Sequence, residues 1–124
     1  MLYIKLMCLL ILLSSCSIGY RVIPNYYLNK DVITQMNFLY DPWMEKGFCV
    51  SSYEVHNILD GGWMSYPLPI CNFTEIVFHT HPIWAENGAN ILDGLIWDEY
   101  NRRFGNKKYG VMLGIDEFKV YIKE

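Results

Sequence analysis

The stretch Thr74-Glu75-Ile76-Val77-Phe78-His79-Thr80-His81-Pro82 is the clearest strand in the sequence, and the rest of the chain is best interpreted around it. Side chains alternate between the two faces of a strand. His79 and His81 therefore point to the same face as Val77 and away from Phe78. The proline that closes the stretch ends the strand where the two imidazoles emerge.

The segments around this strand predict an α/β fold in which a small mixed β-sheet is flanked by helices. Apolar spacing predicts a helix from Asn29, its N-cap, to Tyr40, although the β-branched residues there leave a strand open. A second helix is expected from Asn90 to Phe104, with Gly105 as its stop. Its apolar face is expected to consist of Leu92, Leu95, Ile96, Tyr100 and Phe104. Further strands are expected at Phe48–Val55, Trp63–Tyr66 (a short return strand after a turn at residues 60–62), Tyr109–Leu113 and Phe118–Ile122.

Composition limits the classes of protein to which the chain can belong. Its 124 residues suffice for one domain, and 52% hydrophobic residues can form a core. A net charge of -3 and a pI near 5.5 argue against nucleic acid as the main partner, because phosphate binding needs a basic surface.

The first residues predict export rather than a part of the fold. Lys5 precedes an apolar segment, residues 6–13, that is too short for an ordinary transmembrane helix. Leu13-Ser14-Ser15-Cys16 resembles the bacterial lipobox, in which the cysteine is acylated; the alternative is an ordinary secretory signal that contains a cysteine. The expected organisation is a lipoprotein signal peptide (1–15), a tether (16–25) and one domain (26–124). Ser17 is not the aspartate that retains lipoproteins in the inner membrane, which favours the outer membrane, facing the periplasm.

Two cysteines remain in the expected domain, Cys49 and Cys71. An even number of cysteines in an oxidising compartment is typical of a disulfide. Two buried thiols are the alternative, and the sequence does not decide between them.

His79, His81 and Asp93 are the candidate ligands of a metal ion. Two imidazoles and a carboxylate with one open position suit catalytic zinc. A pair of exposed histidines is the alternative for the imidazoles. Asp93 has a structural alternative as well, because Asn90 and Asp93 have the spacing of a helix N-cap and an acidic N3 residue. The two roles of Asp93 are compatible, since a helix start packed beside the strand end would direct its carboxylate at the imidazoles.

His79-Thr80-His81-Pro82, followed after seven residues by Asn90 and after two more by Asp93, resembles the signature of the JAMM (MPN+, JAB-domain) zinc metallopeptidases. That signature is His-x-His-Pro-x7-Ser-x2-Asp, with a glutamate on an earlier strand, so Asn90 replaces the family's serine. The resemblance implies an MPN/JAB-like fold with cytidine-deaminase-like layering, and Zn²⁺ bound by His79, His81 and Asp93. It also implies a catalytic glutamate, for which Glu45 is the preferred candidate. The other candidates are Glu54, Glu75 and Glu86.

The expected mechanism is hydrolysis of an amide bond by zinc-activated water. Glu45 would accept the proton of that water and return it to the leaving amine. Asn90 would donate the hydrogen bond that the family's serine supplies to the tetrahedral intermediate.

The expected function is a peptidase or isopeptidase tethered to the membrane through lipidated Cys16, with peptides of the cell wall as substrates. The alternative is a non-catalytic or weakly active MPN-like binding module. His56 is expected to lie at the surface rather than to ligate a metal, and Trp84 is a candidate for the wall of a substrate groove.

Overall fold

The computed structural model describes residues 19–61, 68–85 and 87–124, which form a six-stranded sheet with two helices. The strands follow the order β1-β6-β5-β4-β2-β3 across the sheet. Only β4 and β5 pair in parallel among these neighbours, so the sheet is mixed, and the predicted fold class of a small mixed sheet flanked by helices is confirmed. The elements are β1 (Tyr20–Ile23), α2 (Lys30–Leu39), β2 (Lys46–Val50), β3 (Val55–Asp60), β4 (Ile76–Thr80), α3 (Ile91–Phe104), β5 (Lys108–Gly114) and β6 (Glu117–Lys123).

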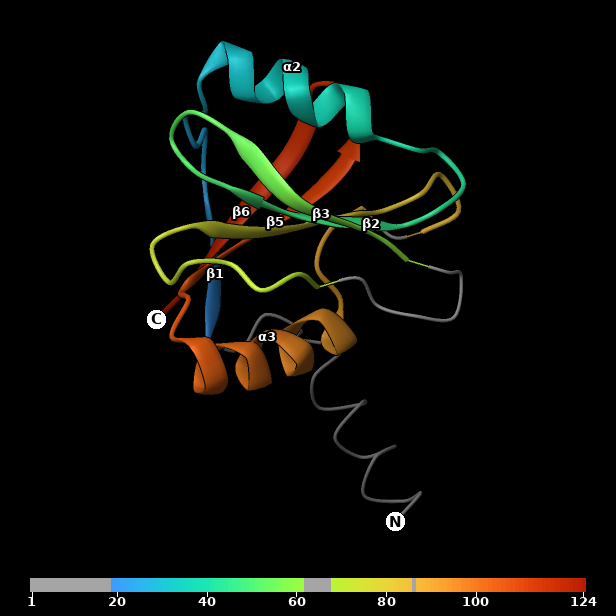
Figure 1. Ribbon diagram of the computed structural model, residues 1–124. Coiled ribbons are helices and arrows are strands. Elements are labelled where there is room, and N and C mark those ends of the chain that lie inside the picture. Colours follow the sequence, from blue (N-terminus) through green and yellow to red (C-terminus); the bar gives the residue numbers. More distant parts are fainter. Residues whose placement is uncertain (1–18, 62–67, 86) are drawn as a thin grey trace.

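The two helices cover opposite faces of the sheet (Figure 1). Helix α3 lies between β4 and β5 in the sequence, as parallel neighbours require a long crossover connection. Helix α2 lies over the other face, and Asn29 is its N-cap as predicted, because its side chain accepts a hydrogen bond from the Asp31 amide at 2.8 Å.

The core under α2 follows from strand alternation. Val32 and Met36 from the helix pack with Phe48, Phe78 and other apolar side chains of the sheet. The Phe48 and Phe78 rings are stacked with centroids 5.6 Å apart. A Cβ atom on Gly110 would lie 2.3 Å from the Phe78 ring, so only glycine allows this ring to lie across β5.

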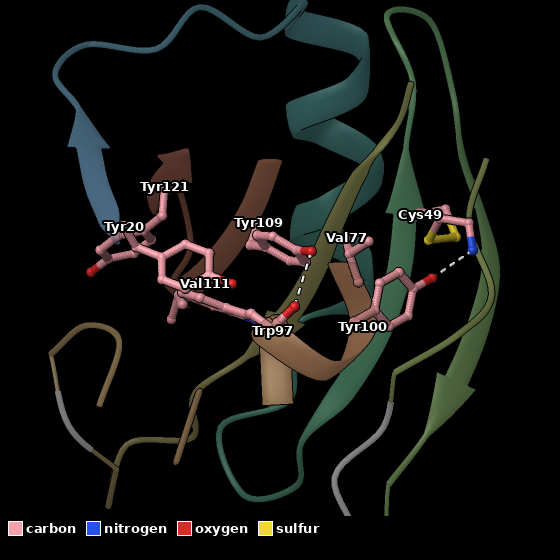
Figure 2. Packing of buried hydrophobic residues seen from close by; sticks show 9 residues of the cluster. Tyr20, Cys49, Val77, Trp97, Tyr100, Tyr109, Val111 and Tyr121 are labelled. Carbon is pink, nitrogen blue, oxygen red and sulfur yellow. Dashed lines mark hydrogen bonds between the residues drawn. A yellow bond between two sulfur atoms is a disulfide. The ribbon is translucent and has the colours of Figure 1, made fainter. Parts of the chain in front are cut away.

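The core under α3 is mainly aromatic (Figure 2). Trp97 is fully buried, and its ring stacks on Tyr109 with centroids 5.1 Å apart. The predicted apolar face of α3 was wrong in part, because Leu92 and Leu95 are each 56% exposed. The buried residues of this helix are Asp93, Trp97 and Tyr100. Spacings of four and three residues place these three side chains on one face, and the packing of the two large aromatic rings sets the rotation of the helix.

Cys49 and Cys71 form a disulfide beside this core, with Cα atoms 5.5 Å apart. The hydroxyl of Tyr100 accepts a hydrogen bond from the Cys71 amide at 2.8 Å (Figure 2). The same hydroxyl donates to the Pro69 carbonyl at 2.6 Å. The segment before β4 is thereby attached to both the sheet and α3. The disulfide decides between the two states that the sequence left open for these cysteines, a disulfide or two buried thiols.

Two expectations about the strands need correction, and a third lies outside the described residues. The predicted strand Phe48–Val55 is two strands, β2 and β3, because Ser51 closes a turn in which its amide donates to the Glu54 carbonyl at 3.0 Å. The expected return strand Trp63–Tyr66 lies outside the described residues. Residues 20–23 of the expected tether are β1, which pairs with β6 at the edge of the sheet.

Candidate metal centre

The two histidines of the Thr74–Pro82 stretch lie together at the end of β4. His79 is fully buried and His81 is 3% exposed. Their Nε2 atoms are 2.9 Å apart. The His81 amide donates to the Met112 carbonyl at 2.8 Å, which continues the β4–β5 pairing beyond Thr80 and keeps the second imidazole on the face of the first.

Asp93 reaches the imidazoles from the first turn of α3. Its Oδ1 lies 3.2 Å from Nε2 of His79, and its Oδ2 lies 3.5 Å from Nε2 of His81. The same Oδ2 accepts a hydrogen bond from the Asn90 amide at 2.9 Å, while the Asn90 Oδ1 accepts one from the Asp93 amide at 2.9 Å. The capping box is therefore complete. Asp93 caps the helix and lies beside the two histidines at the same time, so its two predicted roles are compatible.

These three residues fit the donor set of a zinc ion. One ligand-capable atom of each lies within 4.8 Å of the others, and all three side chains are buried. Tetrahedral zinc with bonds of about 2.0 to 2.2 Å places its donors about 3.3 to 3.6 Å apart. The separations of 2.9, 3.2 and 3.5 Å are close to that range, so small side-chain shifts would suffice to admit the ion.

Burial favours the neutral form of His79. Loss of solvation lowers the pKa of this imidazole, an effect that the hydrogen bond and the charge of Asp93 oppose. A neutral imidazole has the lone pair that a metal requires, so the buried position suits a ligand.

Glu45 lies beside the three residues, immediately before β2. In the antiparallel pairing of β2 with β4, Gly47 is opposite His79, and the same register continued by two residues would bring Glu45 opposite His81. Burial raises the pKa of the Glu45 carboxyl; the charge of His81 lowers it and that of Asp93 raises it. Glu45 is thus within electrostatic reach of two of the candidate ligands.

The two other described glutamate candidates, Glu54 and Glu75, lie away from this cluster. Glu54 is exposed in the turn between β2 and β3. Glu75 lies at the opposite end of β4, where it pairs with His56. Glu86 lies outside the described residues. Glu45 has an electrostatic interaction with both His81 and Asp93, whereas Glu54 and Glu75 interact with His56.

A second group of ligand-capable residues consists of Cys49, His56 and Glu75. The sulfur of Cys49 is bonded to Cys71, and His56 is in close contact with the Glu75 carboxylate. His56, which was expected at the surface, has a side chain that is 34% exposed on the edge strand β3 and is paired with Glu75.

The sequence did not indicate which residues position the histidine turn. Tyr40 donates from its hydroxyl to the His81 carbonyl at 2.9 Å. The Thr80 hydroxyl accepts a hydrogen bond from the Lys46 amide at 2.8 Å, which joins the end of β4 to the start of β2. The Trp97 ring lies 6.1 Å from the His79 ring, centroid to centroid. Trp97 follows Asp93 by four residues. This helical spacing is the one feature of the sequence that could have indicated that Trp97 lies on the same face of the helix as Asp93.

The expected lipidation site, Cys16, lies outside the described residues. Within residues 19–61, 68–85 and 87–124, neither helix has the length and apolar character needed to cross a membrane.

The arrangement can bind a divalent metal through two imidazoles and a carboxylate, with a second carboxylate at hand for proton transfer. No family model matches the sequence, and no curated protein and no solved structure was found to match it.

Proposed function

We propose that this chain is a zinc-dependent peptidase or isopeptidase of the JAMM type, with an MPN/JAB-like layering of its sheet and helices. One observation carries the proposal: His79, His81 and Asp93 converge within 4.8 Å, and Glu45 interacts with two of them. The four residues come from three separate parts of the chain, and all of them occupy positions that match the JAMM pattern.

In the proposed mechanism, His79, His81 and Asp93 hold zinc, and the capping box of α3 fixes the carboxylate of Asp93. Zinc bound there would supply Lewis acidity, which polarises an amide carbonyl and lowers the pKa of a bound water towards about 7. Because burial raises the pKa of Glu45, its carboxylate is a better proton acceptor than an ordinary glutamate. Glu45 takes the proton of the attacking water and transfers it to the leaving amine.

Asn90 is proposed as the donor that stabilises negative charge on the substrate oxygen. Its Oδ1 is engaged with the Asp93 amide, so Nδ2 is the side-chain atom that can donate. The amide group therefore can serve the helix cap with its oxygen and the substrate with its nitrogen.

The proposed setting is outside the cytoplasm, with lipidated Cys16 as the anchor in the outer membrane and the domain in the periplasm. The lipobox-like Leu13-Ser14-Ser15-Cys16 supports this setting. Peptide stems or cross-links of the cell wall are the amide substrates that such an enzyme would meet, and nucleic acid is not proposed as a partner.

The decisive experiment is hydrolysis of a peptide library by zinc-loaded protein, with Glu45→Gln as the test variant. We expect kcat to fall roughly 10²- to 10⁴-fold, as for loss of a general base, while the zinc content stays that of the wild type. Glu54→Gln is the matched control, since Glu54 is exposed in a turn that has no part in the cluster. Undiminished hydrolysis in Glu45→Gln would refute its role.

A second candidate function is a binding module that retains zinc without turnover, and the position of Asn90 favours it. The family's serine is replaced by a residue whose oxygen is engaged in the helix cap. Stoichiometric zinc with no hydrolysis across the library would support the module, whereas hydrolysis abolished by a chelator and restored by zinc would support the enzyme.

A further inference from the structure

Two exposed tryptophans stand close in sequence to the proposed site. Trp43 is 64% exposed and Trp84 is 58% exposed. The neighbouring Met44 and Ile83 are also exposed. Large aromatic rings left in water at a concave or functional site typically serve recognition, because their burial on binding is favourable.

Hydrogen bonds between two loops hold these rings in place. The Ile83 amide donates to the Pro42 carbonyl at 2.9 Å. The indole Nε1 of Trp84 donates to the Trp43 carbonyl at 3.1 Å. The Asp41 carboxylate accepts the Trp43 amide at 2.8 Å, so the loop that carries Trp43 is itself fixed. Since the indole N–H of Trp84 is already engaged, what this side chain offers to a ligand is its apolar surface.

The position of the pair along the chain limits which part of a substrate it can contact. Trp43 precedes Glu45 by two residues and Trp84 follows His81 by three. A chain spans at most about 3.6 Å per residue, so the backbones of the two tryptophans lie within about 7 and 11 Å of those of Glu45 and His81. An extended peptide advances about 3.3 Å per residue, so the pair is within reach of the first three residues beside the scissile amide.

The charged groups nearby disfavour an acidic ligand. Asp41, Glu45 and Asp60 are all carboxylates of this region, and the cation Lys46 is paired with Asp60 at 3.8 Å. A negatively charged side chain would gain little here, whereas an apolar side chain would bury the exposed rings.

We propose that Trp43 and Trp84 form a specificity subsite for a large apolar side chain, aromatic or branched aliphatic, within three residues of the scissile amide. The subsite rests on the proposed function, since it is the metal centre that fixes where the amide lies. The proposed substrates are therefore peptides with a large apolar residue near the cleaved bond.

The test uses blocked alanine-based peptides in which one residue, Phe, Leu, Ala or Glu, is moved through the positions on both sides of the cleaved bond. For zinc-loaded wild type, we expect kcat/KM at the best position to be roughly 10-fold higher for Phe and Leu than for Ala, and lowest for Glu. Trp43→Ala and Trp84→Ala should bring the ratio of Phe to Ala close to one. Trp84→Phe keeps an aromatic ring and should retain most of the preference.

Phe38→Ala is the control, because Phe38 is 86% exposed on α2, on the other face of the sheet. This variant should keep the wild-type preference. The subsite is wrong if Trp43→Ala and Trp84→Ala keep the wild-type ratio, or if the wild type hydrolyses all four peptides equally well.

Binding of the same peptides to zinc-loaded Glu45→Gln, measured by tryptophan fluorescence, separates the subsite from the catalytic proposal. Apolar preference in binding that Trp84→Ala abolishes would support the subsite even if no peptide is hydrolysed, in which case only the peptidase proposal fails. Hydrolysis and binding without apolar preference would overturn the subsite and leave the peptidase proposal standing.

Discussion

Two groups of metal-ligating residue types lie at opposite ends of β4, on the face that packs against α3. At one end are His79, His81 and Asp93; at the other are Cys49, His56 and Glu75. Both groups bring ligand atoms within 4.8 Å of one another, so distance does not separate them. The difference lies in the chemical state and orientation of the side chains, above all in the Cys49 sulfur, which is bonded to Cys71.

In the second group the ligand atoms are engaged in structural interactions. The Cys49 sulfur is in a disulfide and is no longer a thiolate, and Glu75 is paired with His56 and accepts the Asn72 amide at 2.7 Å. In the first group Asp93 is oriented by the helix cap and burial holds His79 towards its neutral form. Proximity of ligand types is therefore a weak predictor of a metal site unless their protonation and existing bonds are considered.

The largest expected effect is on zinc affinity, when a histidine of the first group is replaced and compared with replacement of the histidine of the second group. His81→Ala should weaken zinc affinity by more than roughly 100-fold, the upper range for loss of an outer-shell partner, because a direct ligand is lost. His56→Ala, the matched control, should bind zinc as the wild type does. Competition with a chromophoric chelator measures both, and zinc loss in His56→Ala alone would reverse the assignment of the two groups.

The disulfide should contribute to stability without affecting zinc. Cys49 and Cys71 are 22 residues apart, and closing a loop of this length stabilises a fold by about 3 kcal/mol. Urea denaturation of Cys49→Ser/Cys71→Ser should show that loss with unchanged zinc stoichiometry. A parallel loss of zinc would mean that the two ends of β4 are not independent.

Asn90 provides a smaller and more specific test of the first group. Asn90→Ala should reduce the free energy of unfolding by about 1 kcal/mol, since the N-cap acceptor is lost. Asn90→Ser should keep the cap and restore the residue of the JAMM pattern. We expect Asn90→Ser to hydrolyse peptides at least as fast as the wild type, and a slower Asn90→Ser variant would show that the amide is needed.

The smallest effect is the pH dependence of the two imidazoles in zinc-free protein. The hydrogen bond to Glu75 raises the pKa of His56 above 6.5, so its contribution to stability is present below pH 6.5 and is lost as pH rises through the raised pKa. Burial lowers the pKa of His79, so its effect on stability depends on pH in the opposite direction. The folded state loses stability as pH falls below 6.5, because the unfolded chain takes up a proton that the buried imidazole does not. NMR titration of both rings checks the directions, and shifts of the same sign would contradict the comparison.

Much of this architecture followed from local patterns. The alternation of residues 74–82 predicted which face carries His79 and His81, and the spacing of Asn90 and Asp93 predicted the cap of α3. The hairpin of β5 and β6 and the Asn29 cap were predicted as well. These features depend on residues within a few positions of one another, where the periods of strand and helix and the chemistry of caps act directly.

Features that depend on distant parts of the chain were predicted less well. The position of the turn that separates β2 from β3 was missed, and so was the inclusion of residues 20–23 in the sheet, because β-propensity does not specify a partner strand. The buried face of α3 was only partly right, since Leu92 and Leu95 have the spacing of an apolar face but the helix is turned towards Trp97 and Asp93.

The sequence by itself determined the identity of the candidate ligands and the two local frames that carry them, a strand end and a helix start. Tertiary structure alone decided that β2 runs antiparallel to β4 with Gly47 opposite His79, that Glu45 comes within electrostatic reach of His81, and that Cys49 joins Cys71. The reason is physical: strand periodicity and helix caps depend on neighbours in the chain, whereas strand register depends on packing of side chains that are far apart in sequence.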